Sequence, residues 1–328
     1  MAATMRTDIG KKRKQNEDAA WFDEKRGVFV VADGMGGHLA GEVASGMAID
    51  AVRKMAARHK KPSIDQIKKT VLGAHERIYQ RAQGNAECAG MGTTLSMLCR
   101  GAGYIYIAHV GDSRIYRLRG GRMEQLTQDH SLVGELVRAG ILTAEEARTH
   151  PRRNIITRAL GSDPHLQPDL YEINVETGDR LLICSDGLSG MVCDNEIEST
   201  LARVRDPQRC ASQLVNEAIA NGGHDNVTVI VADVTGFAEV RRKKMARKTK
   251  LSIALVLVLF AAIVGGAAWG TNEYLHNAAY LADDNGKVAI YRGVPGDVFG
   301  LTYSELVEST DVSVSDLQPG FQERLKEG

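Results

Sequence analysis

Residues 28–34 read Val-Phe-Val-Val-Ala-Asp-Gly, five apolar residues followed by an aspartate and a glycine. Three further apolar runs meet an aspartate in a similar way, at Asp112, at Asp186 and, immediately before the run, at Asp225. Continuous apolar runs of this length are typical of buried strands. We therefore expect four carboxylates at the rim of a hydrophobic core, each held by the rigid backbone at one end of a strand.

Carboxylates gathered at one rim indicate a site for hard metal ions. Several anions repel one another unless cations lie between them. Oxygen ligands suit Mg²⁺ or Mn²⁺, whereas zinc prefers nitrogen and sulfur. We expect Asp33, Asp186 and Asp225 to bind two ions about 3.5–4 Å apart, with a bridging hydroxide as the nucleophile. Gly34 lets the backbone approach closely, so its carbonyl is a further candidate ligand.

Arg13 is a candidate for binding the substrate phosphate. It lies three residues before Asn16-Glu17-Asp18, and a guanidinium can fork onto two phosphate oxygens. The sequence has neither a Cys-x5-Arg phosphate loop nor a GxxxxGK[ST] motif, which agrees with a reaction that needs no covalent nucleophile. Each part alone has an ordinary explanation, because a lone Asp-Gly pair is usually a turn and Arg13 lies in a basic stretch.

Hairpin signals indicate antiparallel sheets. The apolar runs 93–100 and 103–110 are separated by a glycine-rich link that is too short for a crossover. Residues 115–118 and the run from Met123 are joined by Arg119-Gly120-Gly121-Arg122, a second hairpin signal.

Helical spacing appears over residues 43–55 and 64–78, and Pro207 opens a third predicted helix that ends before Asn221. Consecutive helices followed by hairpinned strands indicate an α+β sandwich rather than a doubly wound parallel sheet. Residues 129–158 are polar, rich in Arg and His, and only partly helical. A flap beside the site and an ordinary surface excursion explain that stretch equally well.

Residues 251–270 are 20 residues without a charge, long enough to cross a hydrocarbon core of roughly 30 Å. Seven of the ten residues 241–250 are Lys or Arg, whereas residues 273–328 carry ten acids and four Lys or Arg. This asymmetry places the basic flank in the cytoplasm and the tail outside the cell membrane. The alternatives are a buried core helix for the apolar segment, and binding of anionic lipid or nucleic acid for the basic run.

We therefore predict four parts: a catalytic domain over residues 1–236, a basic linker over 237–250, a transmembrane helix over 251–270 and a small extracytoplasmic tail over 271–328. In the tail we expect at best a short hairpin, and partial disorder, because few aromatic residues are available for a core. All five cysteines precede the predicted span, which agrees with free thiols in a reducing cytosol.

Seven motifs occur in an order that resembles a known family. They are Arg13-x-x-Asn16-Glu17-Asp18, residues 31–37 (VADGMGG), Met91-Gly92-Thr93-Thr94, Val110-Gly111-Asp112-Ser113-Arg114, Thr127-Gln128-Asp129-His130-Ser131, Ser185-Asp186-Gly187 and Asp225-Asn226-Val227-Thr228. Together they resemble the bacterial type 2C metal-dependent Ser/Thr protein phosphatases of the PPM family. The basic linker, the single span and the stretch 291–296 (YRGVPG) also resemble the membrane-anchored, PstP-like subgroup.

The resemblance implies a fold and a role for each candidate residue. The fold is a four-layer α-β-β-α sandwich with the metals at one end of two antiparallel sheets. The roles are a metal bridge for Asp33, a carbonyl ligand for Gly34, ligands of one ion for Asp186 and Asp225, a water-mediated contact for Asp18, a third metal for Asp112 with Asp186, and phosphate binding for Arg13.

One position departs from the family. Animal members carry a histidine directly after the Asp-Gly pair as the proposed general acid, and this chain has Met35 there. Protonation of the leaving oxygen is therefore unassigned. A metal-bound water or His150, reaching in from the predicted flap, are the candidates, and His150 as a plain surface residue is the alternative.

We expect an enzyme that hydrolyses phosphoserine and phosphothreonine in proteins with two Mn²⁺ or Mg²⁺ ions and a third accessory ion. Its expected partners are phosphorylated proteins, including a cognate membrane Ser/Thr kinase, and the membrane itself through one span. We expect a monomer that binds no nucleic acid. The alternatives are a non-enzymatic membrane receptor, and a phosphatase for small molecules or for one dedicated regulator.

Overall fold

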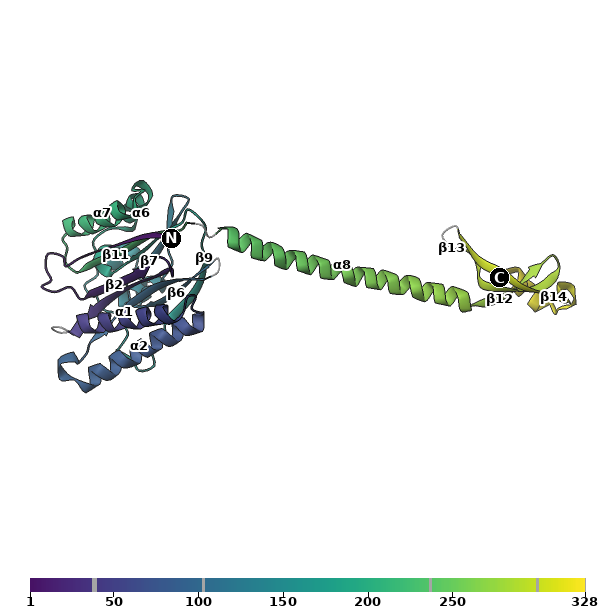
Figure 1. Cartoon of the computed structure of the whole chain (residues 1–328), viewed down its shortest axis with the longest axis horizontal. Coiled ribbons are helices and arrows are strands. Elements are labelled where there is room, and N and C mark those ends of the chain that lie inside the picture. The colour runs from purple at the N-terminus through teal and green to yellow at the C-terminus, as the bar shows by residue number, and fades with distance from the viewer. Residues whose placement is uncertain (37–39, 102–103, 236–237, 299–300, 328) are drawn as a thin grey trace. The chain divides into compact units, whose positions relative to one another are not determined.

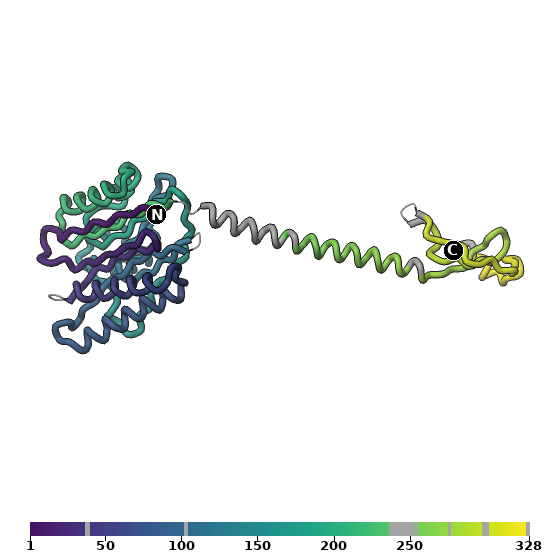
Figure 2. The backbone as a smooth tube through the Cα atoms, viewed as in Figure 1, coloured from purple at the N-terminus to yellow at the C-terminus, as the bar shows by residue number. Residues whose placement is uncertain are grey.

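The computed structural model describes residues 1–36, 40–101, 104–235, 238–298 and 301–327. The chain divides into two compact units, Met1–Lys244 and Met245–Gly328. Figure 1 shows the helices and strands, and Figure 2 traces the backbone. All residues predicted to take part in catalysis belong to the first unit.

One sheet joins the two ends of the first unit. Its strands follow the order β1-β11-β10-β7-β8, and every pair is antiparallel. They are β1 (Ala2–Asp8), β7 (Arg114–Arg119), β8 (Arg122–Gln125), β10 (Arg180–Cys184) and β11 (Val227–Asp233). Ala2 pairs with Asp233, so strands from opposite ends of the unit lie side by side. The predicted hairpin after residue 115 is confirmed as β7–β8.

The second sheet follows the order β2-β3-β5-β6-β9 and is also antiparallel throughout. Its strands are β2 (Asp18–Asp23), β3 (Val28–Met35), β5 (Leu95–Arg100), β6 (Tyr104–Val110) and β9 (Asp169–Asn174), and the short β4 (Gly92–Thr93) pairs with the end of β3. The pairing of Leu95 with Val110 and of Arg100 with Ile105 confirms the other predicted hairpin.

Helices cover the outer face of each sheet, as Figure 1 shows. The second sheet carries α1 (Ala40–Arg58) and α2 (Ile64–Gly84), and the first carries α6 (Asp194–Arg203) and α7 (Pro207–Ala220). Ser63 is the N-cap residue of α2, and its side chain forms a capping box with Gln66. Helix α7 has the predicted proline at its start, after Asp206, whose side chain accepts from the Arg209 amide. All three predicted helices are confirmed.

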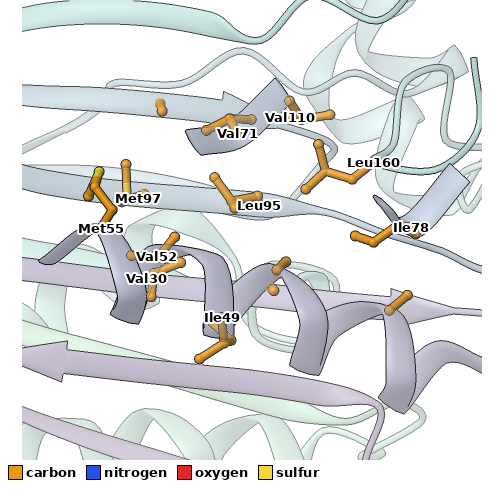
Figure 3. Packing of buried hydrophobic residues seen from close by; sticks show 14 of the residues in the cluster. Val30, Ile49, Val52, Met55, Val71, Ile78, Leu95, Met97, Val110 and Leu160 are labelled. Atoms are coloured by element: carbon orange, nitrogen blue, oxygen red, sulfur yellow. The ribbon is translucent and has the colours of Figure 1, made fainter. Parts of the chain in front are cut away.

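Successive side chains of a strand point to opposite faces of its sheet, so each strand contributes to two separate hydrophobic cores. In β3, Val28, Val30 and Ala32 face α1 and α2, whereas Phe29 and Val31 lie between the two sheets. Figure 3 shows the outer core, where Val30 and Met97 of the sheet approach Val52 and Met55 of α1. Strands buried on both faces explain why their sequences read as unbroken apolar runs. The expected four-layer sandwich is confirmed.

The second unit contains more structure than the sequence predicted. Strands β12 (Ala279–Asp284), β13 (Lys287–Val298) and β14 (Leu301–Ser313) form an antiparallel sheet, followed by α9 (Pro319–Glu327). The expectation of at best a short hairpin was wrong. Tyr280 stacks on Tyr291 with ring centroids 5.5 Å apart, which supplies apolar contact in a sequence poor in aromatics. The shifts in register between β13 and β14 explain why the third strand lacked a clean alternating pattern.

One helix of the described part of the chain is long and apolar enough to cross a membrane. This helix, α8, runs from Ala238 to Asn277 and contains the 20-residue stretch Leu255–Tyr274, with a mean hydropathy of 1.8. The stretch overlaps the predicted span over residues 251–270. Its role in a membrane stays a prediction that rests on length and composition.

Candidate active site

Asp33 and Asp18 lie opposite each other at one end of the second sheet. They are directly paired residues of β3 and β2. The backbone of Asp33 is fixed on its other side, because its amide donates to Thr94 Oγ1 at 2.9 Å and its carbonyl accepts from the Thr94 amide at 2.8 Å. Directly paired residues are among the closest in a sheet. The two carboxylates therefore start from neighbouring, rigid positions.

Gly34 follows Asp33 at a point where no side chain fits. A Cβ atom there would lie 2.1 Å from the carbonyl oxygen of Gly41 and 2.6 Å from that of Glu17. The backbone at Gly34 is thus pressed against α1 and the start of β2. This close approach requires glycine at position 34, whereas the role of its carbonyl as a ligand stays a prediction.

Asp186 and Asp225 come from neighbouring strands of the first sheet. Asp186 begins the short helix α5 (Asp186–Ser189) just after β10, and Asp225 lies just before β11. The Ser185 amide donates to the Thr228 carbonyl at 3.0 Å, which continues the pairing of the two strands up to the site. The packing is close, since a Cβ atom on Gly187 would lie 2.0 Å from the Asn226 carbonyl oxygen.

The two sheets meet at Ser185. Its hydroxyl donates to Asp18 Oδ2 at 2.8 Å and accepts from the Thr228 amide at 3.0 Å. Asp18 belongs to the second sheet and Ser185 follows a strand of the first. The site is therefore built where the ends of both sheets come together.

Asp112 lies in the turn between β6 and β7. Gly111, with φ +110°, lets that turn pass Thr94, and the Thr94 and Ser113 hydroxyls are 2.8 Å apart. Asp112 itself is only 7% exposed. The turn thus brings a fourth strand-end carboxylate to the same region.

Burial and mutual repulsion raise the pKa of these carboxyl groups. The pKa of Asp33 lies well above its ordinary value because of burial first and then the charges of Asp18, Asp186, Asp112 and Asp225. Burial also raises the pKa of Asp18 to about 7 and that of Asp186 to about 6. The pKa of Asp112 is likewise raised well above its ordinary value, by burial and by the charge of Asp186.

The structure therefore brings the predicted aspartates together, and their chemistry fits hard cations. Buried oxygen atoms without a hydrogen-bond partner are found on Asp18, Asp112 and Asp186, in each case Oδ1. Buried acceptors in proteins are nearly always satisfied, so three such atoms in one region suit ligands of an ion or of its water shell. As placed, the described side chains form no ready-made cluster of three or more metal-ligating groups.

Arg13 lies at the edge of this region. Its Nη2 donates to Asp225 Oδ2 at 2.8 Å, and its Nη1 is 3.5 Å from Glu17 Oε2. The side chain of Arg13 is 46% exposed, so solvent reaches the guanidinium. Arg13 is thus beside a candidate metal ligand and accessible, as phosphate binding requires.

A cavity of about 540 Å³ runs from the aspartates to the stretch 129–158. Its lining includes Asp112, Asp186 and Asp225, and also arginines of the stretch that contains α3 (Leu132–Arg138) and α4 (Ala144–Thr149), namely Arg138, Arg148 and Arg153. The flap interpretation of residues 129–158 is therefore favoured over a plain surface excursion. A second, shallow depression of about 1000 Å³ lies along α7, and none of the four strand-end aspartates lines it.

The histidines differ from the sequence-based expectation. His150 directly follows α4 as its C-cap residue, its Nδ1 accepts from the Arg152 amide at 3.2 Å, and it is not among the residues that line the cavity. His224, which precedes Asp225, does line the cavity and was missed. The Met35 side chain packs against Gly92. A Cβ atom added to Gly92 would lie 2.8 Å from the Met35 Cε. No proton donor is supplied by Met35.

Sequence reasoning also missed the residues that hold the site in place. Arg114 forks onto Asp129, with its Nε at 3.0 and 3.1 Å from the two carboxylate oxygens and its Nη2 at 2.8 Å from Oδ2, and so ties the flap to β7. Asn226 and Ser185 were quoted only as parts of motifs, although both have buried side chains with several partners. Their position beside predicted ligands was the available signal.

Known proteins resemble this chain over the first unit. The family described as "Protein phosphatase 2C" matches residues 10–231. The serine/threonine phosphatase stp of Listeria innocua is 41% identical over 241 residues, which cover 71% of this chain and 96% of that protein. The crystal structure of the Mycobacterium tuberculosis serine/threonine phosphatase PstP/Ppp has a TM-score of 0.67 and 36% identity, covering 72% of this chain and 99% of that one. Another crystal structure, of the PstP catalytic domain with two manganese ions, has a TM-score of 0.65 and 36% identity, covering 72% and 98%.

Proposed function

The chain belongs to the protein phosphatase 2C family, and from that premise we propose which of its residues carry out the reaction. As a protein-serine/threonine phosphatase it hydrolyses phosphoserine and phosphothreonine to the free hydroxyl and inorganic phosphate. The single observation that carries the residue assignment is the group of buried aspartates around Asp33, where burial first and then the neighbouring charges raise the Asp33 pKa.

We assign the binding of two Mn²⁺ or Mg²⁺ ions to Asp33, Asp186, Asp225 and the carbonyl of Gly34. Support comes from the unpartnered oxygen of Asp186, from the close backbone approach at Gly34 and from the two manganese ions of the related PstP domain. When bound, such ions supply an activated water and neutralise charge on the phosphoryl group. Asp18 would act through an ion-bound water, and Asp112 with Asp186 would hold a third ion.

Arg13 would orient the phosphate. Its guanidinium, exposed beside Asp225, has donors for a fork onto two phosphate oxygens. Of the two candidates that the sequence offered for proton transfer to the leaving serine or threonine oxygen, we retain the metal-bound water, because His150 does not line the cavity. His150 accordingly has no role in this proposal.

The flap side of the cavity would receive the protein part of the substrate. Three of its arginines line the cavity beside the aspartates, at positions 138, 148 and 153. A chain of this kind acts on protein substrates in the named relatives, and this disfavours the receptor and small-molecule alternatives.

We further propose that α8 anchors the enzyme in the cell membrane, with the catalytic unit in the cytoplasm and the second unit outside. The 20-residue apolar stretch Leu255–Tyr274 and the basic run before it support this topology. An anchored phosphatase would meet the substrates of a membrane Ser/Thr kinase, and the kinase itself. We propose a monomer, because all the assigned ligands come from one chain.

The test compares strains that carry the wild-type chain, Asp186→Ala, or the matched control Asp50→Ala, whose side chain is 64% exposed on α1. Phosphoproteomics should show more phosphoserine and phosphothreonine on specific proteins in the Asp186→Ala strain only. The purified full-length chain should hydrolyse an aryl phosphate only with Mn²⁺ or Mg²⁺. Activity that persists in excess chelator would contradict the proposal.

A further inference from the structure

The nine residues between β1 and β2 form a loop that carries Arg13 and leads directly into Asp18. Most of the loop is exposed, so apolar burial does little to hold it. Its conformation must depend on hydrogen bonds to the rest of the domain. The position of the Arg13 guanidinium therefore depends on what those bonds are.

One side chain supplies three of them. The Nδ2 of Asn226 donates to the Ile9 carbonyl and to the Gln15 carbonyl, each at 2.9 Å. The Oδ1 of Asn226 accepts from the Glu17 amide at 2.8 Å. These contacts reach the start of the loop, the residue two after Arg13 and the end of the loop. Asn226 itself is only 3% exposed.

The carboxamide is the one side-chain group that suits this task. It has two N–H donors and one carbonyl acceptor, and here all three functions are used within the protein. An aspartate would lose both donors, and a serine would be too short to reach three backbone groups. No donor of Asn226 is left for substrate, so its contribution to the reaction must act through the loop.

The loop also sits tightly on the turn that precedes Asn226. The Lys11 amide donates to the Gly223 carbonyl at 2.7 Å. Gly10, with φ +79°, passes so close that a Cβ atom there would lie 2.2 Å from the Asp225 carbonyl oxygen. The backbone of the turn 223–226 therefore contacts the loop at residues 10 and 11, and the Asn226 side chain binds its two ends.

We infer that Asn226 is a positioning residue for Arg13. Its side chain fastens the loop to the turn that carries Asp225, so the guanidinium and this candidate metal ligand keep a fixed separation, now 2.8 Å between Arg13 Nη2 and Asp225 Oδ2. The inference rests on the proposed role of Arg13 in binding phosphate. It goes beyond that role by naming the residue that fixes the position of the Arg13 guanidinium.

The test is a double-mutant cycle in the full-length chain at saturating Mn²⁺, with p-nitrophenyl phosphate as substrate and inorganic phosphate as competitive inhibitor. Arg13→Ala should raise KM and the inhibition constant for phosphate about tenfold or more, as loss of a charge-assisted fork does. Asn226→Ala should raise both by a similar factor, with kcat changed less than about threefold. Arg13→Ala with Asn226→Ala should be no worse than Arg13→Ala alone, because both changes remove the same contact.

Asn221→Ala is the matched control. Asn221 also donates from its side chain to a distant backbone carbonyl, that of Met191 at 3.1 Å, but it does not contact the loop. It should leave KM and the phosphate inhibition constant unchanged. A merely structural role for Asn226 would lower the folded fraction and hence the apparent kcat, without moving either constant.

Gly10→Ala keeps the inference testable if Asn226→Ala does not fold. The added Cβ must push the loop off the turn while every charge and side-chain donor stays in place. It should again raise KM, and not further in the Arg13→Ala background. If Arg13→Ala raises KM while the Asn226 and Gly10 variants do not, or if their effects add, the positioning role is wrong. If Arg13→Ala itself changes nothing, the proposed phosphate role is what fails.

Discussion

Ser185 donates its hydroxyl proton to Asp18 Oδ2 at 2.8 Å, and this contact joins the ends of the two sheets at the candidate metal site. The Ser185 hydroxyl oxygen also accepts a hydrogen bond from the Thr228 amide at 3.0 Å, so this one side chain contacts both sheets. The hydroxyl is one of the groups that lower the pKa of Asp18 against the larger effect of burial.

Ser185→Ala should therefore weaken Mn²⁺ binding about tenfold. Without the Ser185 hydroxyl, the Asp18 carboxylate is no longer held in the orientation that its water-mediated contact with the ion requires. It should also cost about 1–3 kcal/mol of unfolding free energy, because the Thr228 amide is left buried without a partner. Mn²⁺ activation curves and thermal unfolding measure the two effects. Ser162→Ala is the control, because its hydroxyl donates to the Ala159 carbonyl at 2.8 Å away from the aspartates. Equal Mn²⁺ affinities in all three proteins would contradict the assignment of Asp18.

Asp186→Asn should reduce Mn²⁺ affinity by on the order of 100-fold or more, a larger loss than that of an outer-shell partner. In metal-free protein the same change should raise the melting temperature, because it removes one of the mutually repelling buried charges. Isothermal titration with Mn²⁺ and thermal scans in chelator test both directions. Asp50→Asn should move neither quantity.

The pH dependence of Mn²⁺ binding follows from the raised pKa values. Asp18 and Asp186 have pKa values of about 7 and about 6, against an ordinary 3.8. Protons therefore compete with the ion increasingly as pH falls from 8 to 6, and the Mn²⁺ concentration for half-maximal activity should rise severalfold or more over that interval. The same constant at both pH values would show that these carboxyls are not ligands.

The metal-free protein should show the opposite trend in stability. Because these folded carboxyls hold protons that the unfolded chain releases, their contribution is complete below about pH 4 and is lost as pH rises to about 7. Chemical denaturation in chelator at pH 5 and pH 8 should show the loss. Saturating Mn²⁺ should remove it, since ions then occupy the place of the protons.

Gly34→Ala should lower the unfolding free energy by about 1–3 kcal/mol, because its Cβ would overlap the Gly41 carbonyl oxygen at 2.1 Å. Relief of that overlap would displace Asp33, so kcat should fall at least about tenfold. Gly46→Ala is a matched control within α1, where an added Cβ meets nothing within 4 Å. It should stabilise the protein by about 0.5–1 kcal/mol and leave kcat unchanged.

Arg13→Lys should raise KM for an aryl phosphate above the wild-type value but less than Arg13→Ala does, because lysine keeps the charge and loses the planar fork. Arg26→Lys is the control. Arg26 pairs with Asp23 at 2.7 Å and its side chain is 42% exposed, close to the 46% of Arg13, but it lies at the far end of β2 and β3. Only the Arg13 change should alter inhibition by inorganic phosphate.

Strand-end aspartates could be predicted from sequence because a buried strand leaves a local signature. The apolar run before Asp33 and the one before Asp186 both mark where the core ends. The structure then brings both residues to one place, as expected. Local pattern was enough because each residue is positioned by its own strand.

The loop-holding role of Asn226 left no such signature. Its three partners lie 209, 211 and 217 residues earlier in the chain, so only the closed fold reveals them. The cavity position of His224 likewise depends on the packing of the flap. The sheet of the second unit was missed because irregular register hides the alternating pattern on which strand prediction depends.

The pairing of β1 with β11 has a consequence for biosynthesis. Translation produces β1 long before β11, its only described partner strand, which ends at Asp233, so the first sheet stays open until almost the whole catalytic unit has been made. Until then β1 is an unpaired edge that a chaperone or a neighbouring chain could occupy. Closure of the sheet also brings the Arg13 loop onto Asn226. A nascent chain that ends before residue 227 should therefore be inactive and prone to aggregate, and phosphatase activity should first arise only after β11 has been synthesised.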